Sequence, residues 1–231
     1  MRTKSSMTLV VVLLVGWNAM AQDEKPRYPV MAPLEQYLIS DRKAEIALAR
    51  SAAPQSISED AEILILTRHG FETAVRGTNG FTCVVERSWS AGIDDSDFWN
   101  PKLRAPNCFN AAGARSQLPG LMKRTELALA GRSKTEIFAA LHAAVEKKEL
   151  PIPEPGAMCY MMSKQGYLSD RDGHWRPHLM FFLPATDPKS WGAGLVGSPV
   201  IAFKDGTERL TVFLLPVDQW SDGTPASNKG H

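Results

Sequence analysis

The sequence predicts an α+β fold with a mainly antiparallel sheet. Short apolar runs that are typical of strands lie in two groups, at residues 62–89 and 157–216, and two helical segments lie between these groups. A further helical segment precedes the first group. Strands, then helices, then strands again favour α+β over a parallel α/β fold. Several of the runs are apolar at every position, so we expect them to be covered on both faces, by the N-terminal helix and the middle helical pair.

Residues 1–21 have the three parts of a secretory signal peptide. Basic residues near the start are followed by an uncharged apolar stretch at 7–17 and by Ala-Met-Ala at 19–21. The apolar run is much shorter than the ~20 residues that a membrane span needs. We therefore expect cleavage before Gln22 and export to the periplasm or the medium. No cysteine follows the cleavage site directly, so a lipid anchor is not expected.

The remaining chain is long enough for one large domain. Removing 21 residues from 231 leaves 210, for which one domain is the better expectation. We expect a lead-in and N-terminal helix at 22–57, a single α+β domain at 58–220 and a disordered tail at 221–231. Basic and acidic residues nearly balance, 26 against 25, which argues against a nucleic-acid partner. No later segment reaches membrane-spanning length, so the mature chain should be soluble.

The first group of strands is expected to form a three-strand meander at 62–89. The run Ile63–Leu66 is too short for a buried helix and indicates a strand. Asn79-Gly80 then stands between two β-rich segments, and Asn-Gly at such a position favours a hairpin. Residues 90–119 are rich in Gly, Pro, Asp and Asn. We therefore expect a long loop there.

Clear boundaries mark the helices and the second group of strands. A helix is expected at 34–53, restarting near residue 41, and another at 121–130. Ser133 and Glu136 have the spacing of a capping box, which predicts the start of a third. Strands are then expected at 157–163, 179–183, 199–203 and 209–216. The last two flank Asp205-Gly206 and should form a second hairpin.

Three cysteines remain after export. We expect Cys83 and Cys108 to form a disulfide, because exported proteins meet oxidising conditions and the pair would join the long loop to the sheet. Cys159 lies in an apolar strand, where most cysteines fill space in the core. Separate buried thiols, or a pairing with Cys159, stay open as alternatives.

Candidate site residues concentrate at 170–178. Asp172, His174 and His178 alternate along an extended segment, so they are weak candidates for metal ligands. The plainer interpretation is a turn that enters a strand, with His178 hydrogen-bonded and partly buried. Trp175 and Arg176 are candidates for the rim of a ligand-binding site. No cofactor is predicted.

A cysteine nucleophile is the second chemical possibility. Cys159 would act as the thiolate, with His174 or His178 as its base. The apolar residues around Cys159 argue against this role, because burial raises the pKa of a thiol. The weak catalytic candidates are therefore His174, His178 and Cys159.

Several sequence blocks resemble a group of uncharacterised secreted bacterial proteins. The blocks are Gly-Thr-Asn-Gly-Phe-Thr-Cys at 77–83, Pro-Asn-Cys-Phe at 106–109, the helix start at 131–133 and Pro-His-Leu-Met-Phe-Phe at 177–182. No activity is known for that group, so the resemblance implies no mechanism. It covers roughly residues 58–216 and is consistent with one domain.

No complete catalytic pattern is present in the sequence. We therefore expect a non-catalytic binding or envelope-associated module, whose partner is a small molecule or an envelope protein. The alternative is a hydrolase or a metal-dependent enzyme that uses the segment Asp172–His178, with or without Cys159.

Overall fold

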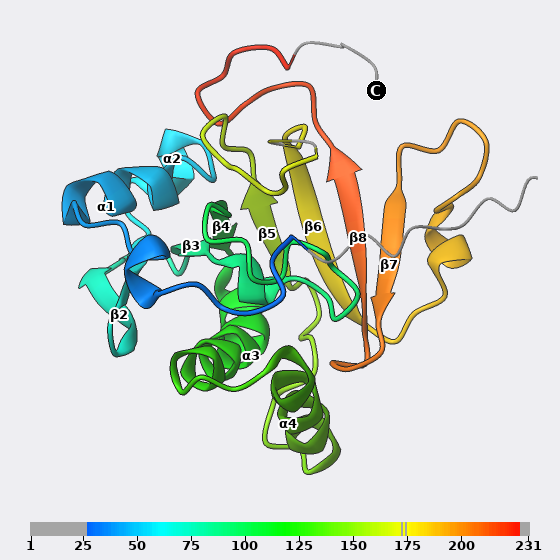
Figure 1. The fold of residues 1–231 in the computed structure, drawn as a ribbon. Coiled ribbons are helices and arrows are strands. Elements are labelled where there is room, and N and C mark those ends of the chain that lie inside the picture. Colours follow the sequence, from blue (N-terminus) through cyan, green and yellow to red (C-terminus); the bar gives the residue numbers. More distant parts are fainter. Residues whose placement is uncertain (1–26, 172, 174, 227–231) are drawn as a thin grey trace, which may run out of the picture.

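The computed structural model describes residues 27–171, 173 and 175–226 (Figure 1). The predicted signal peptide, residues 227–231 and the candidate residues Asp172 and His174 lie outside the described part. The helices are α1 (Arg42–Arg50), α2 (Gln55–Ser58), α3 (Ala111–Leu129) and α4 (Lys134–Glu146). The strands are β1 (Glu62–Thr67), β2 (Gly70–Val75), β3 (Thr82–Glu86), β4 (Ala105–Phe109), β5 (Met158–Met161), β6 (His178–Pro184), β7 (Ile201–Asp205) and β8 (Leu210–Pro216).

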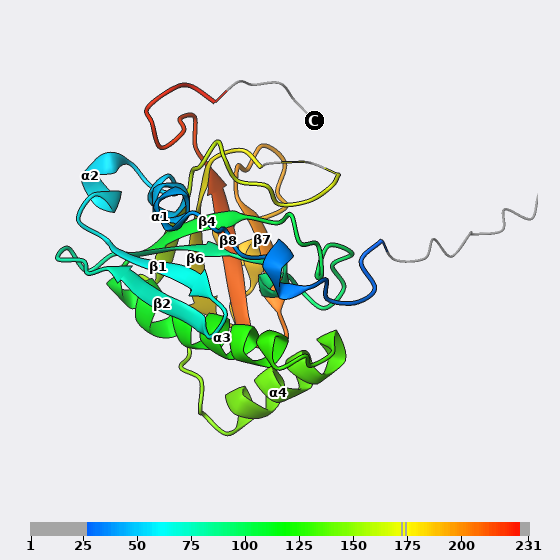
Figure 2. The ribbon, with the colours of Figure 1, turned by 60° about the vertical axis from the view of Figure 1, so that its left-hand side comes forward.

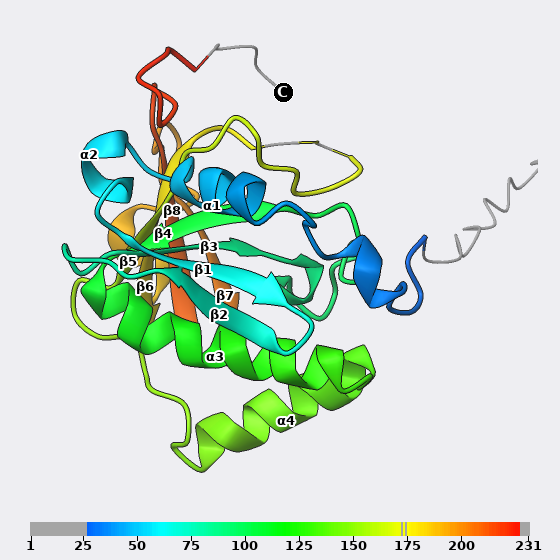
Figure 3. The same ribbon diagram turned by 90° about the vertical axis from the view of Figure 1, so that its left-hand side faces the viewer.

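The fold is α+β, as predicted. All eight strands form one sheet in the order β2-β1-β3-β4-β5-β6-β8-β7. Every neighbouring pair is antiparallel except β1 with β3, which is parallel. Helices α1 and α2 cover one face of the sheet, and α3 and α4 lie on the other (Figures 2 and 3). α1 packs on β1, β3 and β4, and α3 packs on β2, β4 and β5, so the helices cover both faces of this part of the sheet, as expected. Within the described residues, no comparable helix packing covers β6, β7 and β8, so for these strands the expected cover by helices is incomplete.

The predicted meander at 62–89 is wrong in its connections. β1 and β2 form a tight hairpin around residues 68–69, but β3 pairs with β1 and not with β2. The Asn79-Gly80 segment therefore crosses from β2 to the other side of β1. Gly77 allows this crossing, because a Cβ atom there would lie 2.1 Å from the backbone nitrogen of Glu62. Asn79 serves the crossing as well, since its amide donates to the Ile57 carbonyl at 2.7 Å.

The expected loop at 90–119 contains two regular elements. Its second half forms β4 and the first turns of α3, which begins ten residues before the predicted position. The Asn110 side chain caps the helix by accepting from the backbone N–H of Gly113 at 2.8 Å. Pro119 lies inside α3, so this proline did not mark a boundary. A helix that packs along a sheet can tolerate the one missing backbone donor.

The other helix starts follow the sequence. Asp41 caps α1 through the N–H of Lys43 at 2.8 Å. Ser133 and Glu136 form the predicted capping box at the start of α4. α1 ends at Arg50, before Pro54, and Pro54 is the N-cap residue of the short helix α2.

The disulfide and an ion pair lie on the α1 side of the sheet. Cys83 and Cys108 are directly opposite on β3 and β4 and are joined, as predicted. Beside them, Arg87 and Glu45 form an ion pair of 2.7 Å with exposures of 0% and 1%. Arg87 also donates to the carbonyl of Tyr37 at 2.7 Å. The α1 face of the β3–β4 pair is therefore tightly fixed.

The predicted hairpin around Asp205-Gly206 is present as β7 and β8. β7 is the edge strand and leaves Ile201 and Phe203 half-exposed. Residues 219–226, most of them in the segment predicted to be a disordered tail, form a hydrogen-bonded turn that Ser221 anchors to the Met162 carbonyl at 3.0 Å. Among the described residues, none of the helices has the length and apolar character of a membrane span.

Candidate binding cavity on the sheet

A two-lobed cavity lies on the α3 face of the sheet. The larger lobe has a volume of about 490 Å³ and is lined by residues of loop 90–97, of segments 168–171 and 175–178, and of strands β4, β6, β7 and β8. The smaller lobe has a volume of about 170 Å³ and lies between α3 and strands β6, β7 and β8. We call the two together the sheet-face cavity. The lobes meet where they share five lining residues: Glu86, Ser90, Asn107, Met180 and Phe203.

The cavity exists because α3 does not extend over the whole sheet. α3 crosses beneath β2, β1 and β3 (Figure 3), and Gly113 brings its first turn close to β5, where a Cβ would lie 2.6 Å from the Met158 carbonyl oxygen. Residues of loop 90–103 and of the segments 168–171 and 175–178 line the other end of the same face. Between α3 and these residues, the inward-facing side chains of β6, β7 and β8 line open space. The long loop and the 170–178 segment thus line a common cavity.

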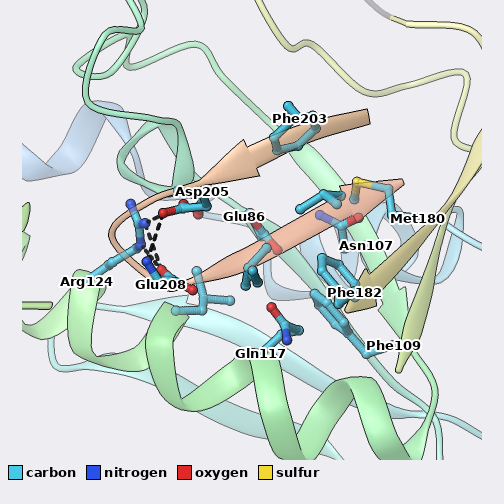
Figure 4. A pocket seen from close by; sticks show the side chains of 14 residues that line it. Glu86, Asn107, Phe109, Gln117, Arg124, Met180, Phe182, Phe203, Asp205 and Glu208 are labelled. Carbon is cyan, nitrogen blue, oxygen red and sulfur yellow. Dashed lines mark hydrogen bonds and ion pairs between the residues drawn. The ribbon is translucent and has the colours of Figure 1, made fainter. Parts of the chain in front are cut away.

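The smaller lobe is closed at one end by ion pairs. Arg124 of α3 is 2.7 Å from Glu208 and 3.7 Å from Asp205, and these side chains face one another at the lobe's end (Figure 4). Arg124 also donates to the Ala91 carbonyl at 3.2 Å, which ties α3 to the loop. The side-chain nitrogen of Gln117 is buried at this lobe without a hydrogen-bond partner among the described residues. A ligand that entered the lobe could accept a hydrogen bond there.

Glu86 is the titratable group at the junction of the lobes. It is the last residue of β3, on the same face as Val84, and it points into the cavity among apolar and polar side chains (Figure 4). Burial raises the pKa of its carboxyl group to about 7. Ser90, Arg124 and Asn107 favour the charged form less strongly. Ser90 lies beside the carboxylate, but its hydroxyl completes no hydrogen bond in the described part of the chain.

Asn107 connects Glu86 to Cys159. It lies on β4 beside both strands, and its Oδ1 accepts a hydrogen bond from the Cys159 thiol at 3.4 Å. The side-chain N–H groups of Asn107 can therefore donate to Glu86 or to a ligand in the cavity. Burial raises the pKa of Cys159 well above its usual range, and the nearby Glu86 carboxylate raises it further. Cys159 is thus a buried thiol rather than an activated one.

His178 lies at the start of β6, at the wall of the larger lobe. It is 3% exposed, and its Nδ1 is 2.8 Å from the Arg176 carbonyl oxygen, to which it can donate. Burial lowers the pKa of His178, so the ring is held neutral near pH 7. This agrees with the interpretation of His178 as a hydrogen-bonded, buried residue. Cys159 pairs with Met180 and His178 with Met161, so the two candidates are diagonal neighbours on one sheet face.

Asp170 holds the segment that covers the larger lobe. Its carboxylate accepts hydrogen bonds from Tyr28 at 2.7 Å, from Asn100 at 3.2 Å and from Tyr167. Arg27 forms an ion pair with it at 2.5 Å. The tyrosine hydroxyls and Arg27 hold the pKa of Asp170 well below its usual range. This carboxylate therefore joins the N-terminal segment, the long loop and the cavity-lining segment.

The remaining sequence candidates separate into three groups. Trp175 lines the larger lobe and is 42% exposed at its mouth, and its ring centroid lies 5.8 Å from that of His178. Arg176 is exposed and is not among the residues that line the cavity. Asp172 and His174 lie outside the described residues. Within the part of the chain that is described, no three His, Cys, Asp or Glu side chains form a metal-binding group.

Sequence reasoning missed Glu86 and Asn107. One signal was available for Glu86, because it is an acidic residue at the end of an apolar strand and shares a face with the buried Val84. Asn107 stood in a segment interpreted as loop, so its inward orientation could not be recognised. Because no strand was predicted in this segment, the position of β4 between β3 and β5 was not predicted either.

Comparisons with protein-family models, with curated proteins and with solved structures found no match to this chain.

Proposed function

We propose that this chain is an exported, non-catalytic binding protein that holds a small, partly apolar molecule in the sheet-face cavity. The observation that carries the proposal is the larger lobe, of about 490 Å³. Small-molecule sites in proteins have volumes of about 300–1,000 Å³, with mainly apolar walls and a few fixed polar groups. Met180 and Phe203 supply apolar wall, and Glu86 and Asn107 supply polar groups.

Two observations support export. Residues 1–21 have the pattern of a cleavable signal peptide, and the Cys83–Cys108 disulfide is typical of an oxidising compartment. The test is N-terminal sequencing of protein recovered from the periplasmic and medium fractions of the natural host. We expect a mature chain that begins at Gln22. An intact Met1 on cytoplasmic protein would contradict export.

Among the described residues, Cys159 and His178 do not form an activated pair of nucleophile and base, which supports a binding role. The Cys159 thiol donates to an amide oxygen and has a raised pKa, and the Nδ1 of His178 is engaged with a backbone carbonyl. A nucleophile needs a base within hydrogen-bonding distance and a lowered pKa. The alternative, a hydrolase that uses Asp172–His178, predicts turnover of ester, amide or phosphate substrates. Turnover that disappears in His178→Ala would favour it over binding.

A thermal-shift screen tests binding. The compounds should be small, partly apolar molecules that include amines, alcohols and carboxylates on the same ring systems. We expect some of them to raise the melting temperature of the wild type. The shift should disappear in Met180→Trp, which fills the junction of the lobes, and weaken in Phe203→Ala, which opens the mouth. Lys204→Ala alters the exposed neighbour of Phe203 on β7 and should keep the wild-type response.

Two results would contradict a binding role for the cavity. The first is that no compound shifts the melting temperature of the wild type. The second is that the shifts persist unchanged in both cavity variants. A folded Met180→Trp variant is confirmed by its unfolding transition without ligand, and Phe203→Ala, at a half-exposed position, gives an independent readout if Met180→Trp does not fold.

A further inference from the structure

We infer that the cavity selects an organic cation, with its ammonium group on Glu86 and its apolar body against Met180, Phe203 and Trp175. This inference rests on the proposed binding function and names the class of ligand. It follows from the charges that line the cavity, from the aromatic side chains at its mouth and from the position of Glu86 between the lobes.

The lining of the larger lobe carries an excess of acidic groups. Four carboxylates line it: Glu86, Asp94, Asp95 and Asp97. Two arginines line the same lobe, but Arg87 is fully buried and bound to Glu45 at 2.7 Å, so it offers no charge to a ligand. Arg171 has an exposed side chain that already takes part in an interaction.

The other charges near the cavity are balanced or absent. In the smaller lobe, Arg124 is paired with both Asp205 and Glu208. Burial lowers the pKa of His178 and keeps its ring uncharged near neutral pH. A positive group that entered the junction would therefore meet Glu86 without a competing free cation from these residues. An anion would meet an acidic lining.

The carboxylates of the lining differ in their freedom to bind a ligand. Asp97 is 8% exposed and accepts from Asn100 at 2.8 Å, and Asp95 caps the turn through the N–H of Asp97 at 2.7 Å. Asp94 lies on the exposed loop. Glu86 is the partly buried acid at the junction, where the surrounding apolar groups weaken competition from water. It is therefore the carboxylate that a ligand cation would approach.

Two aromatic residues and a thioether stand around the entrance. Trp175 and Phe203 are 42% and 49% exposed, which is unusual for large apolar side chains that line a cavity. A cation or an aromatic ring gains favourable energy against such faces. Met180 lies at the junction of the lobes as an adaptable apolar contact. Together they favour a ligand with an aromatic or other apolar body.

The ionisation of Glu86 adds a dependence on pH. Its carboxyl pKa of about 7 means that the charged form needed to hold a cation increases between pH 6 and pH 8. The groups that act on it are few: Ser90, Asn107 and Arg124 favour the charged form, Glu208 opposes it, and the thiol of Cys159 stays protonated. His178 stays uncharged over most of this range. Binding of a permanent cation should therefore strengthen as the pH rises.

The test compares three probes of nearly equal size: tryptamine, tryptophol and indole-3-acetate. They carry a cation, a neutral hydroxyl and an anion on the same ring. Isothermal titration calorimetry at pH 8 should show tryptamine binding at least about tenfold more tightly than tryptophol, as expected for a charge-assisted hydrogen bond in a partly buried site. Indole-3-acetate should bind most weakly. Lowering the pH to 6 should weaken the binding of tryptamine by about fivefold to tenfold and leave that of tryptophol unchanged.

Two variants locate the effect. Glu86→Gln should remove the preference for tryptamine over tryptophol and its dependence on pH, while tryptophol still binds. Asp94→Asn is the control, because it also removes one negative charge, but from an exposed loop residue. It should change the affinity for tryptamine by less than about threefold, because an exposed charge is screened by water and salt. The tryptophol result also shows whether Glu86→Gln keeps an intact cavity.

The possible results distinguish a failure of cation selection by Glu86 from a failure of small-molecule binding in the cavity. If tryptophol or indole-3-acetate binds as tightly as tryptamine, the cavity binds small molecules but does not select cations, and the inference is wrong. If Asp94→Asn has the effect expected of Glu86→Gln, the cation is held at the loop and the inference is also wrong. If none of the probes binds, the proposed function fails together with the inference.

Discussion

The thiol of Cys159 donates a hydrogen bond to Oδ1 of Asn107, at a distance of 3.4 Å. The two residues lie on neighbouring strands, β5 and β4; Asn107 lines the cavity with Glu86, and Cys159 is fully buried in the core beside it. This hydrogen bond fixes the orientation of the Asn107 amide, so that its N–H groups point toward the Glu86 carboxylate. Cys159 therefore supports the cavity wall through Asn107, and this role requires neither oxidation nor nucleophilic chemistry.

The state of the three cysteines can be counted by alkylation. We expect iodoacetamide to modify no cysteine in the native protein, because Cys159 is buried and burial raises its pKa. Denaturation without a reductant should expose one reactive thiol, and denaturation with a reductant should expose three. Mass spectrometry of the intact chain gives the number directly. Rapid modification of the native protein, or three thiols before reduction, would be incompatible with the structure.

The ion pair between Glu45 and Arg87 should be important for stability. Glu45→Gln would leave a guanidinium group uncompensated at a position with 0% exposure. Breaking one partner of a buried pair costs about 3–5 kcal/mol of unfolding free energy. Glu35→Gln is the matched control, because Glu35 pairs with Arg68 at 2.7 Å but both side chains are more than half exposed. The control should lose less than about 1 kcal/mol, and equal losses in urea unfolding would refute the distinction.

Asp170 should control the order of the segment that covers the larger lobe. Asp170→Asn removes the charge that Arg27 and the hydroxyls of Tyr28 and Tyr167 stabilise. We expect faster hydrogen exchange in residues 167–171 and in loop 97–102, with the exchange of β1 and β3 unchanged. Asp222→Asn removes an exposed carboxylate that pairs with Lys164 at 2.8 Å, and it serves as the control. Unchanged exchange in Asp170→Asn would show that the segment is held by other contacts.

Glu86 should make the protein less stable as the pH rises from about 4.5 to 7. Its carboxyl pKa is about 7 in the folded chain and near 4.5 when unfolded. Between these values the folded chain binds the extra proton, so the contribution of Glu86 is fully present below 4.5 and is lost as the pH rises through 7. The full loss is up to about 3 kcal/mol.

His178 has the opposite effect on the pH dependence of stability. Its pKa is lowered in the folded chain, so its contribution is present above pH 6.5 and is lost as the pH falls below this value. Unfolding of Glu86→Gln at several pH values isolates the first effect by difference from the wild type. The variant should gain stability relative to the wild type at pH 8 and not at pH 4.5. A constant difference between the two proteins would exclude a raised pKa for Glu86.

The sequence was informative wherever the local pattern determines the structure. The capping box at Ser133, the hairpin around Asp205-Gly206 and the Cys83–Cys108 pair follow from residues that are close in the chain or limited in number. The order of the strands does not follow from local pattern. Asn79-Gly80 has the chemistry of a hairpin turn, and only the parallel contact of β1 with β3 shows that it forms a crossover.

The cavity was harder to predict than the fold. Its walls come from β4, β6, β7, β8, the long loop and α3, which are brought together only by the sheet order. Of the candidates that the sequence placed at 170–178, Trp175 and His178 line the cavity, whereas Arg176, expected with Trp175 at the rim of a binding site, does not. Glu86 and Asn107 were missed, because one inward-facing polar residue on a strand becomes a site only when the opposite wall is known.

A crystal structure of the protein grown with tryptamine would show directly whether Glu86 binds a cation. We expect the indole between Met180, Phe203 and Trp175, with the ammonium nitrogen within hydrogen-bonding distance of the Glu86 carboxylate. A cavity that holds only water, or tryptamine bound elsewhere on the protein, would contradict this expectation.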